Sequence, residues 1–354
     1  MPRPREQEPR RPRSEEGSRR VRWDPQHLSF VRDGLRTARA ASGLHAARAV
    51  TRVEIVVTSG SGDGRAVATA NGLLPALAAR GYVGRVRCFA NADELHGWAR
   101  RCALEFSHLL CVGGDATQSA AAAAASRLAV PLVPVPSGFG NIFARALGYE
   151  HQRLSVADLI EHGDLRRVDV GLAGEQIFLC HRSYGFLENV QSAVERSRAQ
   201  PRSRLRRHLA YYRTAREILR GPLPSIAVDV DGARVAEESA LVTVANVETY
   251  RGFLTLTPAA SPFDGLLDIC VVPRTTKRRL LARLLGLLLR WPGRWNGIRL
   301  VRGRSIAVHV DGRPRDDLRI APAALPLILP PACETTGREP GVAAAPQRRA
   351  HCAA

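Results

Sequence analysis

Short apolar runs alternate with segments of helical periodicity between residues 51 and 148. A continuous apolar run is typical of a strand buried on both faces, and apolar positions three and four apart indicate an amphipathic helix. The pattern predicts strands at Val53–Val57, Val83–Phe89, His108–Val112 and Val130–Val135, and helices at Arg65–Arg80, Ala92–Glu105, Thr117–Leu128 and Asn141–Leu147. Alternating strands and helices with short connections favour a doubly wound parallel sheet covered by helices on both faces.

The pattern changes after about residue 165, where strand-like segments follow one another without intervening helices. They are predicted at Gln176–Arg182, Ser225–Val230, Ala240–Asn246, Leu267–Val272 and Ser305–Val310. One long helical region, Glu188–Leu219, interrupts them. The predicted fold is therefore α/β, with an N-terminal doubly wound parallel-sheet domain followed by a mainly antiparallel β domain.

The boundaries of these parts follow from composition. Residues 1–45 are rich in Arg, Pro and Glu and are predicted to be a disordered or poorly ordered extension. The α/β domain is expected at 46–165 and the β-rich domain at 166–320, and 321–330 is expected to return and pack near the first domain. Residues 331–354 are predicted to be a disordered tail.

Composition excludes several classes of protein. A hydrophobic share of 45% argues against a wholly disordered chain, and no apolar stretch is long enough to predict a membrane span. The N-terminus lacks the apolar core of a secretory signal. The seven scattered cysteines form no Cys-x-x-Cys pair, which predicts reduced thiols in the cytoplasm and no zinc site.

The formal net charge of +19 is distributed unevenly. Basic residues are dense in segments 196–220 and 274–304, and no acidic residue lies between Asp268 and Asp311. Runs of one sign attract polyanions such as nucleic acid or anionic lipid, although a solvated surface in an arginine-biased protein explains either run equally well. With few aromatic residues and no recognisable nucleic-acid motif, no specific nucleic-acid partner is expected.

Two glycine turns follow the third and fourth predicted strands, and each precedes a helix. The first is Gly113-Gly-Asp-Ala-Thr-Gln118 and the second is Pro136-Ser-Gly-Phe-Gly-Asn141. Glycine lets a ligand approach the backbone closely, and a helix start offers free N–H groups, so phosphate is the expected ligand. Asp115 suits such a site if a Mg²⁺ stands between it and the phosphate, or if it accepts a proton. The alternative is that Asp115, Thr117 and Asn141 only cap helices.

A third glycine turn, Thr58-Ser-Gly-Ser-Gly62, follows the first predicted strand. Its spacing differs from Gly-x-Gly-x-x-Gly, and no acidic residue ends the second strand, so the dinucleotide fingerprint is absent. A Walker loop and the Gly-x-Ser-x-Gly elbow are missing as well.

In this combination the sequence resembles the diacylglycerol kinase and sphingosine kinase superfamily, in particular its bacterial lipid kinases, over roughly residues 50–330. Gly113-Gly-Asp-Ala-Thr117 is similar to the family's Gly-Gly-Asp-Gly-Thr motif, and Pro136–Gly148 is similar to its Pro-Leu-Gly-Thr-Gly-Asn segment. Ser261–Asp268 is similar to its Asp-Asp-Gly-Leu-Leu-Asp stretch, and Val310-Asp-Gly312 to its late Val-Asp-Gly-Glu.

The resemblance implies a lipid kinase that uses ATP and Mg²⁺ to phosphorylate a diacylglycerol-like or sphingoid hydroxyl. The first domain would then bind nucleotide and the second the lipid. Asp115 and Asp311 would be the catalytic residues, and a structural Mg²⁺ would be held by Asp264 with the carbonyls of Ser261 and Leu266. The implied nucleotide-binding residues are Thr58, Ser59, Gly60, Gly62, Gly114, Asp115, Ala116, Thr117, Gln118, Ser137, Gly138, Gly140 and Asn141.

Four positions depart from the family pattern. Ala116 stands in place of a glycine, Phe139 in place of Thr or Ser, Ile142 in place of a frequent Asp, and Arg313 in place of the acid that serves as general base in bacterial members. Arginine cannot accept a proton, so Asp115 or Asp311 must act as the base in an active enzyme. A catalytically degenerate nucleotide- or lipid-binding member, and an enzyme of the NAD kinase type, are the alternatives.

A short leucine-rich helix is predicted at Leu280–Trp291. It is too short to span a bilayer, and it either packs on the β domain or lies in the headgroup layer. Together with the basic runs, it suggests a cytoplasmic protein that meets its lipid at the anionic inner face of the membrane.

Overall fold

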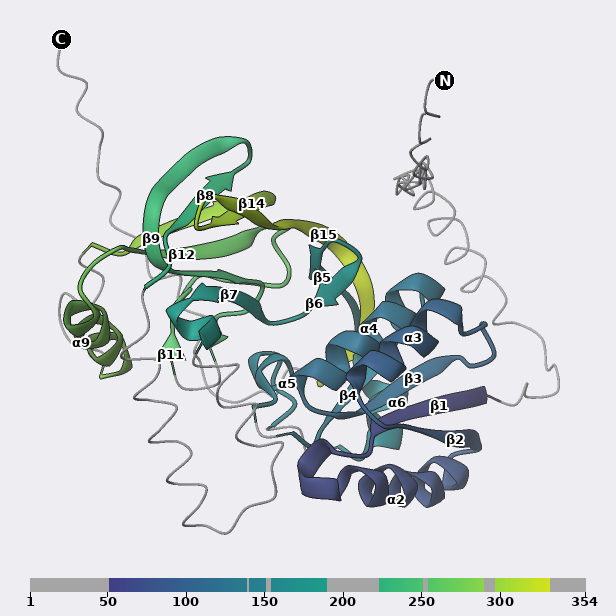
Figure 1. Cartoon of the computed structure of the whole chain (residues 1–354). Helices are drawn as coiled ribbons and strands as arrows, with labels where there is room; N and C mark the ends of the chain where they lie inside the picture. The colour runs from purple at the N-terminus through teal and green to yellow at the C-terminus, as the bar shows by residue number, and fades with distance from the viewer. Residues whose placement is uncertain are drawn as a thin grey trace, which may run out of the picture. The chain divides into compact units, whose positions relative to one another are not determined.

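The computed structural model describes residues 51–138, 140–150, 154–189, 223–250, 254–289 and 297–331 (Figure 1). Four of the sequence-based predictions lie wholly or largely outside these residues. They are the disordered extension 1–45, the tail after residue 331, the helix Glu188–Leu219 beyond its first turn, and the role of Phe139.

The N-terminal part contains four parallel strands in the order β4-β3-β1-β2. The strands are β1 (Thr51–Thr58), β2 (Tyr82–Phe89), β3 (His108–Gly113) and β4 (Leu132–Pro136). Val53 and Ile55–Val57 of β1 and Leu109–Val112 of β3 are fully buried, because helices cover both faces of these central strands. The strand order is that of a doubly wound sheet, as predicted.

The helices of this part lie in two groups. They are α2 (Ala66–Ala79), α3 (Ala92–Arg101), α4 (Asp115–Leu128), α5 (Ile142–Ala146) and α6 (Val156–His162), with a 3₁₀ turn η2 at Ser61–Gly64. Helix α3 packs beside α4, and α2 beside α6 (Figure 1). The helix predicted to reach Glu105 ends at Arg101, since the backbone turns extended at Cys102. Helix α6 was not predicted.

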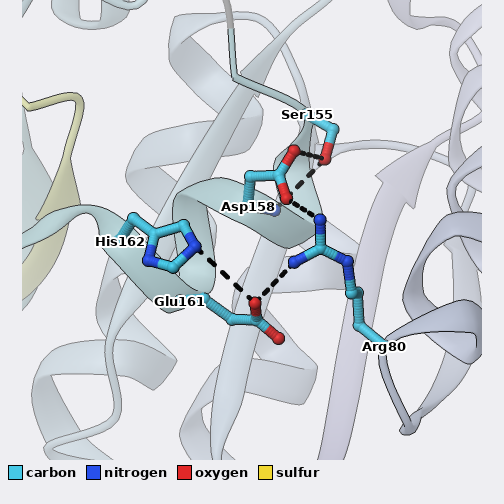
Figure 2. A network of polar contacts seen from close by, with 5 residues as sticks. All are labelled: Arg80, Ser155, Asp158, Glu161 and His162. Carbon is cyan, nitrogen blue, oxygen red and sulfur yellow. Dashed lines mark hydrogen bonds and ion pairs between the residues drawn. The ribbon is translucent and has the colours of Figure 1, made fainter.

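Polar contacts join α2 to α6 (Figure 2). Arg80, the residue that follows α2, forms ion pairs with Asp158 and with Glu161, the latter at 2.6 Å. Ser155 caps α6 by accepting a hydrogen bond from the Asp158 backbone N–H at 3.1 Å, and its hydroxyl donates to the Asp158 carboxylate at 2.7 Å. The Ser155 hydrogen bond, aided by Arg80, lowers the pKa of Asp158. Since Arg80 is substantially exposed, these contacts fix the position of α6 more than they add stability.

The rest of the described chain is mainly antiparallel, as predicted. Its strands are β5 (Asp164–Ala173), β6 (Gln176–Phe178), β7 (His181–Gly185), β8 (Ile226–Val230), β9 (Ala233–Ala245), β10 (Thr249–Tyr250), β11 (Leu254–Thr255), β12 (Leu267–Pro273), β13 (Arg299–Gly303), β14 (Ser305–Val310) and β15 (Arg313–Leu329). The strand predicted at Gln176–Arg182 is in fact two, because β6 pairs with β5 whereas β7 pairs with β9. The leucine-rich helix, α9 (Lys277–Leu288), begins earlier than expected, at a Thr276 cap.

Strand β15 joins the two parts into one 13-stranded sheet. Its first half pairs with β14, and near its end Leu327 pairs in parallel with Leu132 of β4. Over most of its length β15 also pairs with β5. The glycine turns after β1, β3 and β4 therefore lie at the carboxyl ends of strands in a sheet that continues into the antiparallel part.

Candidate functional site

The candidate site lies between β1 and β3, where the order in which the chain adds strands to the parallel sheet reverses. Strands β1 and β3 are neighbours, and Val57 pairs with Val112 near their carboxyl ends. The connection from β1 leads toward β2 on one side, and that from β3 leads toward β4 on the other. Ligands of doubly wound sheets bind at such a switch point, beyond the carboxyl ends of the strands. The turns at 58–62 and 113–118 both begin there.

Three hydroxyl groups meet at the base of these turns. Thr58 Oγ1 lies 2.9 Å from Thr117 Oγ1 and 2.6 Å from Ser61 Oγ, and Ser61 Oγ lies 3.3 Å from Thr117 Oγ1. Thr58 and Thr117 are buried. Thr58 and Thr117 were predicted as ligand-contacting residues, and Ser61, at the start of η2 within the predicted stretch 58–62, joins them.

The glycine turns touch one another through backbone that has no side chain. A Cβ on Gly138 would lie 2.5 Å from Gly114 Cα, and a Cβ on Gly62 would lie 2.4 Å from the Ser137 carbonyl oxygen. The Ser137 N–H donates to the Gly113 carbonyl at 3.2 Å. The structure thus brings the turns after β1, β3 and β4 into direct contact, as their positions in the sequence led us to expect.

Asp115 does not cap its own helix. Its Oδ1 accepts a hydrogen bond from the Phe143 N–H in the first turn of α5 at 3.1 Å, and a Cβ on Gly140 would come within 2.9 Å of its Oδ2. The Cys180 thiol, from the turn between β6 and β7, donates to Oδ1 at 3.4 Å. Burial raises the pKa of this thiol, which keeps it a protonated donor. The carboxylate therefore ties the turn after β3 to the turn after β4 and to the antiparallel part.

Asn141 stabilises the second turn from within. Its backbone has a φ of +46°, its Oδ1 accepts from the Gly138 N–H at 2.9 Å, and its Nδ2 donates to the Gly138 carbonyl at 2.8 Å. The side chain closes the turn rather than capping α5, so the helix-cap alternative does not describe Asn141.

Two buried polar atoms at the site have no hydrogen-bond partner among the described residues. They are Gln118 Oε1 and Ser137 Oγ. The amide nitrogen of Gln118 donates to the Gly113 carbonyl at 3.2 Å, which holds that side chain beneath the first turn. Buried polar atoms are usually paired, so these two are candidates for contact with a ligand or water.

The remaining predicted nucleotide-binding residues lie on the rim. Ser59, Gly60 and Ala116 are exposed, and Ser59 Oγ donates to the Ala90 carbonyl at 3.3 Å. A Cβ on Gly60 would meet no atom within 4 Å. Because Ala116 is exposed, its methyl group does not crowd the interior of the turn.

The structure places Asp311 in a different setting from Asp115. It lies in the tight turn between β14 and β15 with a φ of +49°. Its Oδ1 accepts from the Ser225 N–H at 2.9 Å and its own N–H donates to the Ser225 carbonyl at 2.8 Å. These contacts secure the start of β8, and neither reaches the glycine turns. Arg313 is exposed at the start of β15.

A cavity of about 370 Å³ adjoins this turn. Its lining is largely polar, so it does not suit an acyl chain. The residues that line it include Ser225, Arg234, Glu237, Glu238, His309 and Gly312.

The carboxylate proposed for a structural Mg²⁺ is paired with a backbone N–H group and with an arginine. Asp264 Oδ2 forms an ion pair with the Arg302 guanidinium, and Asp264 Oδ1 accepts from the Leu266 N–H at 3.1 Å. Arg302 also pairs with the buried Asp268 at 3.2 Å. The Asp264 carboxylate is thus paired with a guanidinium here, and a Mg²⁺ held by Asp264 with the carbonyls of Ser261 and Leu266 stays a prediction. Within the described ranges, no group of three His, Cys, Asp or Glu residues is placed to bind a metal.

Asp169, which the sequence analysis did not single out, organises the same loop. It is buried in β5, and its carboxylate accepts from the Gly265 and Ala323 N–H groups, both at 2.7 Å. Its own N–H donates to the Pro262 carbonyl at 2.8 Å. A single acid within the apolar run Val168–Val170 is the signal that could have identified it, since a buried carboxylate needs donors nearby.

Two family models match consecutive parts of the chain. The diacylglycerol kinase catalytic domain matches residues 52–173, and the YegS C-terminal NAD kinase beta sandwich-like domain matches residues 184–324. The first match contains all three glycine turns, and the second contains Asp264 and Asp311.

Curated proteins and solved structures agree with these matches. A diacylglycerol kinase of Mycobacterium tuberculosis is 29% identical over 229 residues, which cover 62% of this chain and 73% of that protein. A Pseudomonas fluorescens protein named "Probable lipid kinase YegS-like" is 30% identical over 240 residues, covering 63% and 78%. The crystal structure of a diacylglycerol kinase from Bacillus anthracis superposes with a TM-score of 0.58 at 21% identity, over 81% of this chain and 99% of that one, which supports the fold.

Proposed function

Because this chain belongs to the diacylglycerol kinase family of lipid kinases, we propose that it transfers the γ-phosphoryl group of ATP to a lipid hydroxyl. The observation that carries the proposal is the contact of three glycine turns around Asp115 at the switch point of the sheet. Backbone N–H groups at the start of α4, together with turns that lack side chains, suit a triphosphate.

In this proposal the turns at 58–62, 113–118 and 137–141 hold the nucleotide. Thr58, Ser61 and Thr117 form a hydroxyl floor that fixes the first two turns, and Ser137 Oγ is free to contact a phosphate oxygen. ATP would arrive as its magnesium complex, which supplies charge neutralisation for the phosphates. Little covalent chemistry is required of the protein, since phosphoryl transfer depends mainly on positioning and charge.

Asp115 is the proposed proton acceptor. The acceptor oxygen attacks the γ-phosphorus, the bond to the β–γ bridging oxygen breaks, ADP leaves, and the hydroxyl proton passes to the carboxylate. The Phe143 N–H and the Cys180 thiol hold Oδ1, which orients the carboxylate. Asp311 is the less favoured base, because its hydrogen bonds hold it to Ser225 and neither reaches the glycine turns.

The test is a transfer assay with labelled ATP, Mg²⁺ and a panel of diacylglycerols, sphingoid bases and NAD. We expect a labelled lipid product from the wild-type protein. Asp115→Asn keeps the shape and the hydrogen-bond acceptor but loses the proton acceptor, so turnover should fall by about a hundredfold or more at an unchanged melting temperature. Asp317→Asn, an exposed change of the same chemistry, is the control.

The other outcomes separate the alternatives. A labelled NAD product with no labelled lipid identifies an NAD kinase-type enzyme. Thermal stabilisation by ATP and Mg²⁺ without any product identifies a nucleotide-binding member that has lost catalysis. In that case Arg313→Glu tests whether an acid at this position restores product formation. Wild-type turnover in Asp115→Asn would remove Asp115 from the mechanism.

A further inference from the structure

Helix α9 packs against the antiparallel part through one of its two apolar faces. Leu280 and Leu287 are buried and Leu284 packs beside them, against Cys270 and Val272 of β12 among others. Positions 280, 284 and 287 are spaced as one helical stripe, which accounts for the docking of the helix on the sheet. Within the described residues, no helix is both long and apolar enough to cross a membrane.

A second leucine stripe lies about a third of a turn around α9 from the buried one, includes the residue after the helix and is exposed to solvent. Leu281, Leu285, Leu288 and Leu289 are 38%, 51%, 45% and 58% exposed. They stand at i, i+4, i+7 and i+8, so they form one continuous strip, which we call the leucine face. Single exposed leucines are common, but four aligned on one helix indicate a binding surface.

The edge strand β13 carries another exposed leucine on the same side of the sheet as α9. Leu300 of β13 pairs with Cys270, so it points to the α9 side of the sheet, and it is 46% exposed. Figure 1 shows α9 at the end of the antiparallel part away from β1 to β4. The leucine face therefore does not belong to the glycine-turn site.

The surroundings of the leucine face are basic. Lys277, Arg278, Arg279 and Arg283 lie on α9, and the sequence has no acidic residue from 269 to 310. On the neighbouring strand β9, Glu238 is paired with Arg274 at 3.7 Å. An apolar strip next to a group of basic side chains is complementary to an anionic bilayer, whose headgroups meet the arginines while its acyl boundary takes the leucines.

We propose that the leucine face of α9 docks this protein on the surface of an anionic lipid bilayer. The reason for such docking rests on the proposed function, since an enzyme that modifies membrane lipids must meet them at the bilayer. The exposed leucines and the basic residues around them do not depend on that function. A second copy of the chain is the other occupant of an apolar strip, but the density of positive charge disfavours pairing the face with itself.

The test is flotation with vesicles of phosphatidylcholine alone or mixed with phosphatidylglycerol. The triple variant Leu281→Gln, Leu285→Gln, Leu288→Gln should bind mixed vesicles at least tenfold more weakly than wild type. The matched control, Leu104→Gln with Leu165→Gln, changes leucines that are 62% and 56% exposed elsewhere and should bind as wild type. Arg278→Gln with Arg279→Gln should remove the preference for phosphatidylglycerol. Equal binding by the triple variant and wild type would refute the proposal.

Two further measurements keep the outcomes distinct. Phosphorylation of a short-chain, water-soluble diacylglycerol should be equal in the triple variant and wild type, because α9 lies outside the glycine-turn site. If no lipid is phosphorylated, whether presented in solution or in vesicles, the proposed function fails while the flotation result still stands on its own. If the triple variant changes the oligomeric state in gel filtration but not vesicle binding, the leucine face is a dimer contact and docking on lipid is refuted.

Discussion

The absence of a single methyl group at Gly138 decides whether the glycine turns can meet. A Cβ there would lie 2.5 Å from Gly114 Cα and 3.1 Å from the Gly114 nitrogen, so the obstacle is backbone, which cannot rotate away. Gly60, in the turn after β1, has open space around its missing side chain. Gly138 thus requires the absence of a side chain and Gly60 does not, and the sequence alone does not distinguish the two positions.

Gly138→Ala should therefore force the turns apart. We expect a loss of about 1–3 kcal/mol in the free energy of unfolding, as for other overpacked sites, and a loss of thermal stabilisation by ATP. Gly60→Ala should leave both unchanged. Chemical denaturation and thermal shift with nucleotide measure the two effects, and equal behaviour of the two variants would contradict the close contact of the turns.

At the scale of elements, β5 fixes the loop between β11 and β12 through one carboxylate. Asp169 is 4% exposed and accepts hydrogen bonds from the N–H groups of Gly265 and Ala323. These donors follow Asp169 in the chain by 96 and 154 positions. Arg302 closes the other side of this loop by pairing with Asp264 and Asp268. The loop is held by the protein's own charges, from two strands that are not its neighbours in sequence.

Asp169→Ala should destabilise the fold, because it removes the acceptor of the Gly265 and Ala323 N–H groups. Gly265 is half-buried and Ala323 is exposed, so the expected loss is about 1–3 kcal/mol in urea unfolding. Asp164→Ala removes an exposed acid from the same strand and should have little effect. A loss of under 1 kcal/mol in Asp169→Ala would show that water replaces the carboxylate.

The same elements show which features a sequence can predict. Strands β1, β3 and β4 were predictable because they are buried on both faces and so form largely apolar runs, interrupted in β1 by the buried Glu54. Strand β15 was not, because it begins with exposed charged residues and contains Pro314, Pro322 and Pro326, which ordinarily argue against a strand. It persists because β5 and β14 supply partners around a bulge between Ala321 and Leu325.

For the candidate site, the local parts were predictable and the distant contacts were not. The glycine turns follow from the strands that precede them, and their mutual contact follows from the strand order. The approach of Cys180 to Asp115, across 65 residues, depends on how the antiparallel part folds back, which no local pattern encodes. The pairing of Arg302 with Asp264 is hidden for the same reason.

At the scale of the whole described molecule, the two parts share one sheet. Strand β15 pairs with β14 in the antiparallel part and with β4 in the parallel part, and no other strand pairs with both among those described. Trp98 lies in the parallel part, packed against Phe89 and Phe106 with ring centroids 5.6 and 6.3 Å away. It is therefore a local probe of that part.

This shared strand predicts coupled unfolding. Ile306→Ala, in the buried core of the antiparallel part, should lower the free energy of unfolding by roughly 2–5 kcal/mol. In a protein whose other three tryptophans are replaced by Phe, the Trp98 fluorescence transition should shift by the same amount as the circular dichroism transition. A Trp98 transition that stays in place while circular dichroism shifts would show that the parts unfold separately.

The course of β15 also bears on how this protein can be shortened for study. A fragment that stops near residue 163 would leave the outer edge of β4 bare, with unpaired N–H and C=O groups open to another chain. A fragment that begins near residue 164 would remove β4, with which the end of β15 pairs at Leu327. Ending the chain anywhere before Leu329 should therefore give aggregation rather than a soluble half, and a useful minimal version must run from β1 through the end of β15.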